Sequence, residues 1–169
     1  MKKQIDWKPL LLCLALPLAV GALAALLTQN GMDAFAAVKK PPLTPPNWVF
    51  PVVWSILYLL MGYASYRLLP RGKNGIESPL PIDLADARDR ALAVYAVQLL
   101  LNFLWPLLFF GAGAYLAAMV CLLLLWLCVV YLILLVLDLD RVSAWLLAPY
   151  LLWLTFAAYL NFGVFLRNL

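Results

Sequence analysis

Histidine is absent from this 169-residue chain, and charged side chains account for only 12% of it. Without histidine the chain lacks the commonest ligand of haem iron and transition metals, and no cluster of cysteines or carboxylates takes its place. The sequence also lacks a serine in a nucleophile-elbow motif and a glycine-rich phosphate loop. We therefore expect no metal site, no bound cofactor, no hydrolase triad and no nucleotide-binding site.

Cysteine is scarce too. Cys13, Cys121 and Cys128 each lie within an apolar run, where a thiol acts as a small packing residue, so no disulfide or redox role is expected. What the chain has in abundance is apolar side chain: 67% of its residues are hydrophobic, against roughly 45–50% in soluble domains. A soluble fold of this size cannot hide so much apolar surface, whereas a bilayer removes the need. The net charge of +4 therefore bears on membrane orientation, and no nucleic-acid partner is expected.

Five stretches are apolar and long enough to cross the hydrocarbon core, which needs roughly 20 helical residues. They are Leu10–Leu27, Val49–Leu69, Ala91–Phe110, Ala114–Leu137 and Val142–Leu166. The first follows Lys2 and Lys3 and precedes Ala34-Phe35-Ala36, as a cleaved signal peptide would, but its 18 apolar residues are long for that purpose and favour a transmembrane helix. The sequence thus predicts an all-α integral membrane protein, a five-transmembrane-helix bundle formed by a single domain over residues 1–169 in the lipid bilayer.

The two long connections differ in character. Thr28–Trp48 contains the proline pairs of KKPPLTPPNW. Because proline removes a backbone donor and holds the chain extended, a stiff proline-rich loop is predicted over 28–48 in place of a helix. Pro70–Arg90 is polar and predicts a solvated loop, in which Asp83, Asp86 and Asp89 are expected to form a charged helix start.

The distribution of lysine and arginine predicts the orientation. With five spans, the N-terminus, the second loop and the fourth loop share one side and hold nine basic residues, whereas the other side holds three, Lys39, Lys40 and Arg167. Positive residues favour the cytoplasmic side. In a bacterial inner membrane the N-terminus is therefore expected in the cytoplasm and the C-terminus outside. An outer-membrane location is the alternative and would make this count irrelevant.

Polar and aromatic side chains recur at helical spacing in three of the spans. Each set falls on one face of its helix: Trp54, Tyr58, Met61 and Ser65 in the second span, Gln98, Asn102 and Trp105 in the third, and Tyr150, Trp153, Ala157 and Asn161 in the fifth. Amide side chains are costly toward lipid, so these faces should point into the bundle. Two interpretations stay open: interhelical hydrogen bonds with aromatic packing, or a pocket for a flat, mostly apolar ligand with a few polar groups.

Three motifs carry a family resemblance. KPPLTPPNWVFPVVWSILYLLMGYASY, from Lys40 to Tyr66, resembles the translocator protein family, also called tryptophan-rich sensory proteins, whose mammalian member is the peripheral benzodiazepine receptor. QLLLNFLWPLLFFG, from Gln98 to Gly111, and PYLLWLTFAAYLN, from Pro149 to Asn161, resemble the third- and fifth-helix signatures of that family in the right order. The resemblance spans nearly the whole chain.

This resemblance implies a five-helix bundle, commonly a homodimer, whose ligand cavity is capped by the first loop and binds protoporphyrin IX and related tetrapyrroles. Carried over by position, it places Trp54, Asn102, Trp105 and Trp153 in the cavity with Ala157 and Leu160 beneath. It also matches Trp54 and Trp153 to tryptophans implicated in light- and oxygen-dependent porphyrin breakdown, which would be their catalytic role. The full expected ligand-binding set is Pro45, Trp48, Trp54, Tyr58, Gln98, Asn102, Trp105, Tyr150, Trp153, Ala157 and Leu160.

The fifth span departs from the family in one place. Animal members read LNYY followed by a basic residue, a proposed cholesterol motif, whereas this chain has Phe162 and Gly163 in the tyrosine positions and the basic residue, Arg167, falls late. Such motifs are weak in any case, so tight cholesterol binding is not expected. The pair Gly21 and Ala25 would let helices approach closely within one chain or between two, so the homodimer expectation depends on the resemblance.

Four functional hypotheses remain. The favoured one is a receptor or sensor that binds a tetrapyrrole; the others are a porphyrin transporter, a slow oxidative enzyme that consumes porphyrin with the help of Trp54 and Trp153, and a structural scaffold. No charged residue lies mid-span, which weakens ion-coupled transport and channel conduction without excluding passive transfer.

Overall fold

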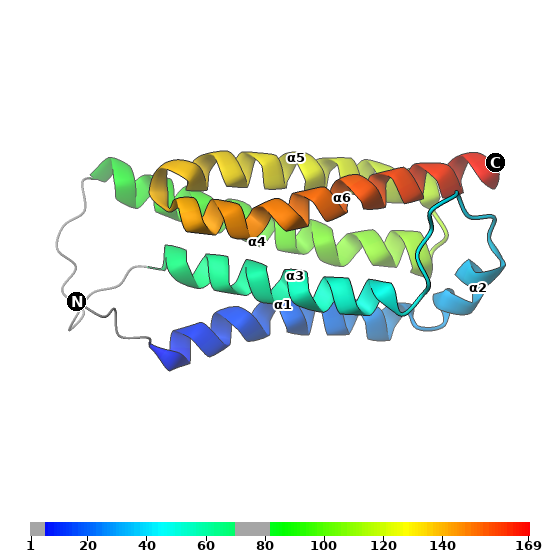
Figure 1. Ribbon diagram of the computed structural model, residues 1–169, viewed down its shortest axis with the longest axis horizontal. Helices are drawn as coiled ribbons and strands as arrows, with labels where there is room; N and C mark the ends of the chain where they lie inside the picture. The colour runs from blue at the N-terminus through cyan, green and yellow to red at the C-terminus, as the bar shows by residue number, and fades with distance from the viewer. Residues whose placement is uncertain (1–5, 70–81) are drawn as a thin grey trace.

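The computed structural model describes residues 6–69 and 82–169 and arranges them almost entirely in helices (Figure 1). In chain order these are α1 (Trp7–Thr28), α2 (Gly31–Ala37), α3 (Val49–Leu68), α4 (Ile82–Pro106), a π-helical turn η2 (Leu107–Gly111) that continues α4, α5 (Tyr115–Leu139) and α6 (Arg141–Arg167). Within this described part, five helices are long and apolar enough to cross a membrane. This confirms the expected all-α integral membrane protein with five spans.

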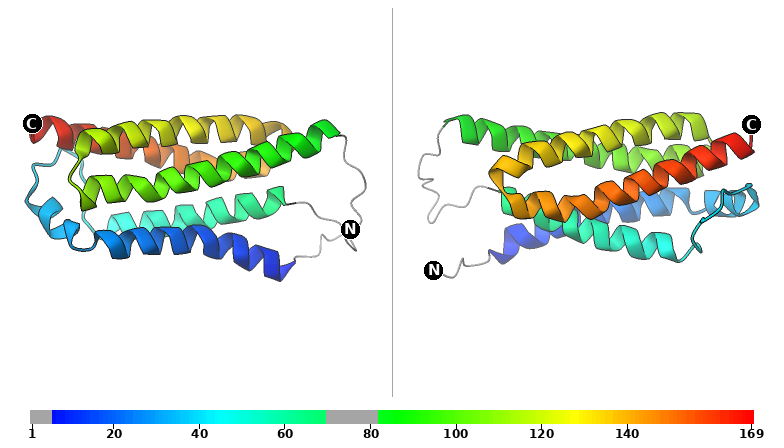
Figure 2. Two further views of the ribbon diagram at one scale, coloured as in Figure 1. Left: turned by 180° about the vertical axis from the view of Figure 1, so that it is seen from behind. Right: turned by 45° about the horizontal axis from the view of Figure 1, so that its top comes forward.

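The long helices form a closed ring. α1 packs on α3, α3 on α6, α6 on α5, α5 on α4, and α4 returns to α1. The two further views in Figure 2 show the same order, with α2 and the first loop at the end of the bundle where the C-terminus lies. The buried centre is built from α3, α5 and α6, and α5 contributes the fully buried Leu122, Leu125, Val129 and Leu132.

Two expected boundaries are corrected. The loop predicted over 28–48 contains the helix α2, because the helix-breaking prolines begin only at Pro41 and leave Gly31–Ala37 free to close a helical turn. α4 begins at Ile82 and not at Ala91, so Asp86 and Asp89 already lie in helix. Hydropathy marks where lipid begins, whereas a helix continues into water as long as its backbone bonds are made. The loop expected before it falls on 70–81, outside the described residues.

α1 and α3 approach each other closely at Gly62. A Cβ atom at this position in α3 would lie 2.5 Å from the carbonyl oxygen of Cys13 and 2.8 Å from Cα of Leu14, both backbone atoms of α1. Only glycine fits between two helix backbones at that separation. The contact matters because α1 is the least buried of the five spans.

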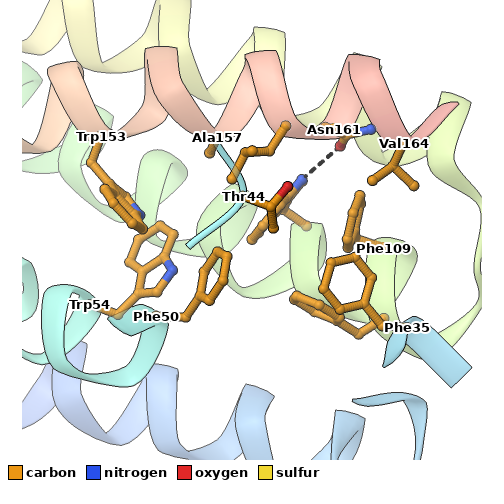
Figure 3. A pocket seen from close by; sticks show the side chains of 12 residues that line it. Phe35, Thr44, Phe50, Trp54, Phe109, Trp153, Ala157, Asn161 and Val164 are labelled. Carbon is orange, nitrogen blue, oxygen red and sulfur yellow. Dashed lines mark hydrogen bonds between the residues drawn. The ribbon is translucent and has the colours of Figure 1, made fainter. Parts of the chain in front are cut away.

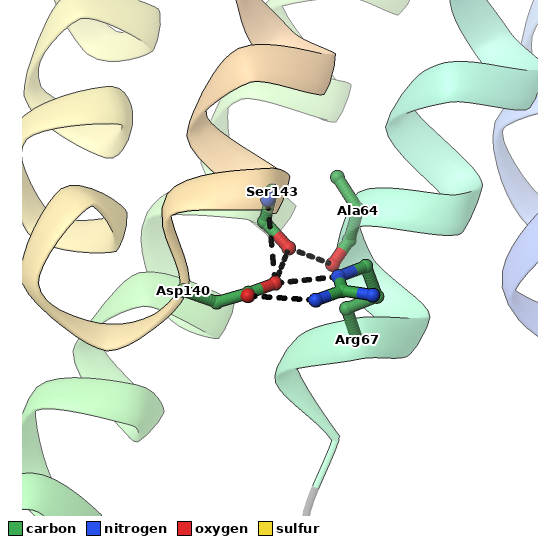
Figure 4. Close-up of polar contacts among 4 residues, drawn as sticks. All are labelled: Ala64, Arg67, Asp140 and Ser143. Atoms are coloured by element: carbon green, nitrogen blue, oxygen red, sulfur yellow. Dashed lines mark hydrogen bonds and ion pairs between the residues drawn. The ribbon is translucent and has the colours of Figure 1, made fainter. Parts of the chain in front are cut away.

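An ion pair fastens α3 to the junction of α5 and α6 (Figure 4). The Arg67 guanidinium donates to both carboxylate oxygens of Asp140, at 2.6 and 2.8 Å. Asp140 also accepts from the backbone N–H of Ser143 at 3.3 Å and from its hydroxyl at 2.5 Å, which caps the start of α6. The Ser143 hydroxyl lies 3.3 Å from the Ala64 carbonyl of α3, so three helices meet at this cluster.

The ion pair predicts a pH dependence of stability. The Arg67 guanidinium holds the pKa of Asp140 at about 2, below its ordinary 3.8, so the pair stabilises the fold above pH 3.8 and this contribution is lost as the pH falls through 2. Asp140→Asn keeps a capping side chain but removes the charge, and we expect it to cost about 1 kcal/mol at pH 6. Thermal unfolding in detergent from pH 6 to 2 should show the difference from wild type shrinking. Asp138→Asn, an exposed carboxylate in α5, is the control.

Candidate functional site

A cavity of about 570 Å³ lies between α1, α3 and α4, within the roughly 300–1,000 Å³ typical of small-molecule sites. Each wall has its own chemistry: small residues from α1 (Gly21, Ala22, Ala24, Ala25), aromatic rings from α3 and η2 (Phe50, Trp54, Tyr58, Phe110), the amide and indole of α4 (Asn102, Trp105), and Phe35 and Asn47 from the first connection. Two of the lining residues, Ala25 of α1 and Ser55 of α3, are exposed, so the cavity reaches the surface of the bundle.

A second hollow lies on the other side of Trp54, against α6 (Figure 3). It has a volume of only about 20 Å³, close to the space one water molecule needs. Trp153, Ala157, Leu160, Asn161 and Val164 line it from α6, and Thr44 from the first loop. Phe35, Phe50, Trp54, Trp105 and Phe110 line both hollows. The α1 side of the aromatic wall therefore has room for a ligand, while the α6 side is closed.

Trp54 is at the centre of the aromatic wall. Its ring stacks on Tyr58 with centroids 5.5 Å apart, and it lies 6.3 Å from Trp105, 6.1 Å from Tyr150 and 6.5 Å from Trp153. All four separations fall within the range of favourable aromatic pairs. Three helices thus contribute rings to one continuous surface, as the helical spacing of these residues predicts.

A chain of hydrogen bonds runs behind this wall. Tyr58 donates its hydroxyl to Oδ1 of Asn102 at 2.8 Å, Asn102 donates from Nδ2 to Tyr150 at 2.7 Å, and Tyr150 donates to Oε1 of Gln98 at 3.0 Å. All four side chains are buried, and Gln98 and Tyr150 are fully so. Two of the four, Tyr58 and Asn102, also line the 570 Å³ cavity. Asn102 therefore joins helices and faces the cavity at once, whereas Gln98 serves only the interhelical hydrogen bonds.

Trp105 and Trp153 differ in whether the indole N–H is hydrogen-bonded. Trp105 donates to Oδ1 of Asn161 at 3.1 Å, and Asn161 donates in turn to the Tyr115 carbonyl at 2.9 Å, so Trp105 is fixed in orientation. The indole nitrogen of Trp153 is buried and has no hydrogen-bond partner within the described residues. A buried unpaired donor is costly, so the indole N–H of Trp153 can gain free energy from a hydrogen bond that Trp105 already has.

The first loop is fastened to α6 near the cavity. Asn168 binds the backbone of Lys39 through two hydrogen bonds, and Tyr159 donates to the Pro42 carbonyl at 2.9 Å. Gly163, where animal members carry a tyrosine, leaves the space that Pro41 occupies: a Cβ there would lie 2.5 Å from the proline ring. The Lys40 ammonium lies 4.7 Å from the Phe35 ring centroid, which brings a cation to the edge of both hollows.

The expected site residues therefore divide into groups. Trp54, Tyr58, Asn102 and Trp105 line the large cavity, and Trp153, Ala157 and Leu160 line the small hollow together with Trp54 and Trp105. Gln98 and Tyr150 lie behind the wall in the hydrogen-bond chain. Pro45 and Trp48 line neither hollow, and Trp48 is 67% exposed.

Several lining residues were absent from the expected set. They include the small residues of α1, the phenylalanines Phe35, Phe50 and Phe110, and the polar residues Asn47 and Ser55. The sequence did single out Gly21, as a small residue that lets helices approach closely, and the structure shows that approach: a Cβ at Gly21 would overlap the Tyr58 ring. Nothing in the sequence singled out the three phenylalanines, since a phenylalanine in an apolar run is equally suited to face lipid.

Fold and site together define the class: a polytopic helical membrane protein whose spans enclose an aromatic-lined cavity. The profile of the TspO/MBR family matches residues 13–167. The chain is 36% identical to the tryptophan-rich protein TspO of Chlorobaculum tepidum over 171 residues, covering 99% of both chains. It is 34% identical to the tryptophan-rich sensory protein of Cereibacter sphaeroides, covering 98% of this chain and 94% of the relative, and 35% identical to the translocator protein of Bos taurus, covering 96% and 91%. The chain belongs to the TspO/MBR family.

Proposed function

We propose that the protein is a membrane receptor that binds protoporphyrin IX or a related tetrapyrrole in the cavity between α1, α3 and α4. The observation that carries the proposal is the cavity itself, about 570 Å³ walled by the rings of Trp54, Tyr58 and Trp105. A flat apolar macrocycle needs stacking surfaces of this kind, and Asn102 offers it a polar contact. The relatives named as a sensory protein and as translocator proteins support a receptor role.

The ends of the bundle suggest how such a ligand lies. Protoporphyrin IX has an apolar body and propionate carboxylates along one edge. Lys40 brings an ammonium beside Phe35, at the end of the bundle where the first loop crosses α6. We infer that the carboxylate edge faces Lys40 while the macrocycle lies against Trp54. With the N-terminus in the cytoplasm, as the basic residues favour, this end of the cavity faces outward.

A porphyrin titration in darkness tests the proposal. Wild-type protein in detergent should show saturable quenching of tryptophan fluorescence by protoporphyrin IX, because the ligand lies against indoles. Lys40→Gln should weaken binding by roughly 3- to 10-fold, about 1 kcal/mol for one partly exposed ion pair, and the difference should shrink in high salt. Lys39→Gln, an exposed neighbour, is the matched control and should bind as wild type does.

The outcomes of this titration separate two claims. Absence of saturable quenching in the wild type would refute tetrapyrrole binding. Equal affinity of wild type and Lys40→Gln would leave the receptor in place and refute only the pairing of a carboxylate with Lys40.

A second candidate is slow, light-dependent breakdown of the bound porphyrin, with dioxygen as the oxidant. The observation that favours it is the edge-to-face contact of Trp54 and Trp153, whose ring centroids lie 6.5 Å apart; the indole N–H of Trp153 has no hydrogen-bond partner in residues 6–69 and 82–169. Trp54 lines the cavity and Trp153 lies directly behind it, so an electron from Trp153 can pass through Trp54 to the excited macrocycle, which dioxygen then reoxidises. Binding comes first in either case.

A further inference from the structure

The hydrogen-bond chain behind the cavity has a direction. Three hydrogen bonds join four side chains, here called the polar chain: Tyr58, Asn102, Tyr150 and Gln98. In each bond the donor lies on the Tyr58 side and the acceptor on the Gln98 side. At the cavity end the Tyr58 proton is committed to Asn102, so the Tyr58 oxygen presents only lone pairs to a ligand. In this arrangement the Tyr58 hydroxyl can only accept a hydrogen bond from a ligand.

The far end of the polar chain is unsatisfied. Nε2 of Gln98 is buried and has no partner within the described residues, although its side chain is fully enclosed. Buried donors are nearly always paired, so this exception asks for a physical reason. The reason we consider is that the amide groups of Asn102 and Gln98 can each rotate by a half-turn, which exchanges their donor and acceptor sides.

After that half-turn the nitrogen and oxygen of each amide have exchanged positions, and every bond of the chain reverses without movement of the helices or of the tyrosine rings. Gln98 donates to Tyr150, Tyr150 to Asn102, and Asn102 to Tyr58, which frees the Tyr58 proton to point into the cavity. The amino group of Gln98 is then satisfied and its carbonyl is left without a partner. Each direction thus leaves one buried atom of Gln98 unpaired, so neither direction is strongly favoured by the protein alone.

We propose that the polar chain reverses with the ligand, so that the cavity binds flat apolar molecules carrying either a hydrogen-bond donor or a hydrogen-bond acceptor opposite Tyr58. Gln98 is the positioning residue: it does not line the cavity and acts through Tyr150 and Asn102. This inference rests on the proposed function, since it requires that the cavity between α1, α3 and α4 takes a ligand.

Two probes of nearly the same flat shape test the reversal. Carbazole offers an N–H donor and 9-fluorenone a carbonyl acceptor. Calorimetric titration of wild-type protein in detergent, corrected for empty micelles, should give affinities for the two within a few-fold of each other. The readout for each variant is the ratio of the two dissociation constants, which a change in overall stability would not move.

Gln98→Met should shift that ratio toward fluorenone by roughly 3- to 10-fold, the effect of one hydrogen bond. The thioether is a poor acceptor, so the Tyr150 proton turns to Asn102 and the chain stays in the direction that frees the Tyr58 proton. Gln98→Glu, uncharged at this buried position as a protonated carboxyl group, keeps both a donor and an acceptor and should retain the wild-type ratio. In a Tyr58→Phe background, Gln98→Met should leave the ratio unchanged. Gln98→Leu makes the same test should the methionine variant fail to fold.

An unchanged ratio in the folded Gln98→Met or Gln98→Leu protein would overturn the reversal. Failure of both probes to bind the wild type would also overturn it, and protoporphyrin IX then separates the two claims. If the porphyrin still binds, the receptor proposal stands and only the reversal is lost; if it does not, both are lost.

Discussion

Replacing Gly62 with leucine is expected to detach α1 from the bundle and destabilise the protein by about 3 kcal/mol or more, the upper end for overpacking. The new side chain would meet the α1 backbone at Cys13 and Leu14, and a helix backbone cannot move aside as a side-chain tip can. α1 has little else to hold it, because it is the least buried span and packs chiefly on α3. Unfolding of the purified protein by SDS titration in mixed micelles measures the loss, and porphyrin binding should fall with it because α1 forms one wall of the cavity.

Gly111→Ala is the matched control for Gly62→Leu. The nearest heavy atom to a Cβ at Gly111 is Cγ2 of Thr28 at 3.8 Å, an ordinary contact, so we expect a change within about 0.5 kcal/mol. Gly113 is unsuitable as a control, because its φ of 61° lies in the left-handed region that favours glycine. If Gly62→Leu were as stable as wild type, the close approach of α1 and α3 would be wrong.

The fold was predictable from sequence because a membrane imposes a length and a polarity on each span. The five spans follow from hydropathy alone, and each is present. The start of α4 at Ile82 was predicted in part: the aspartates were expected to form a charged helix start, as they do, but hydropathy alone put the beginning of the span at Ala91. The short helix α2 was hidden by the prolines that follow it, which dominate the composition of the first connection.

The site was predictable in its residue types and less so in its shape. Helical spacing brings Trp54, Asn102 and Trp105 onto inward faces, and the structure has all three at one cavity wall. Spacing does not tell on which side of Trp54 the space lies, because that depends on how closely the neighbouring helices approach. Here the small residues of α1 leave a large volume, whereas α6 closes against the same ring. Gly21 was open to two interpretations, and its contact with Tyr58 makes it part of the cavity wall.

Trp54→Ala is expected to have the largest effect on ligand binding of any single substitution. Its ring lies between the two hollows and contacts Tyr58, Trp105, Tyr150 and Trp153. Removing it takes away the main stacking surface, which should weaken protoporphyrin binding by roughly 30- to 150-fold, about 2–3 kcal/mol. The dark fluorescence titration measures this, with Soret absorbance as a second signal that does not depend on the lost indole.

Substitution of two exposed tryptophans tests whether the loss of any indole, whatever its position, weakens porphyrin binding. Trp145→Ala, 75% exposed near the start of α6, should bind porphyrin as wild type does. Trp48→Ala is the more informative variant: the sequence pattern puts Trp48 in the binding set, whereas it is 67% exposed and lines neither hollow, so we expect unchanged affinity. If Trp48→Ala weakened binding as much as Trp54→Ala does, the ligand would lie on the surface of the loop, and binding in the cavity between α1, α3 and α4 would be contradicted.

Phenylalanine at the same position separates stacking from redox chemistry. Trp54→Phe and Trp153→Phe keep an aromatic face, so binding in darkness should stay within a few-fold of wild type, while the easily oxidised indole is gone. Illumination of the saturated complexes in air then distinguishes the two candidate functions. Loss of the porphyrin band in wild type that slows in both variants, and stops when dioxygen is removed, would favour the enzyme. A stable band in all three proteins would leave a receptor whose tryptophans stack on the ligand and take no part in its oxidation.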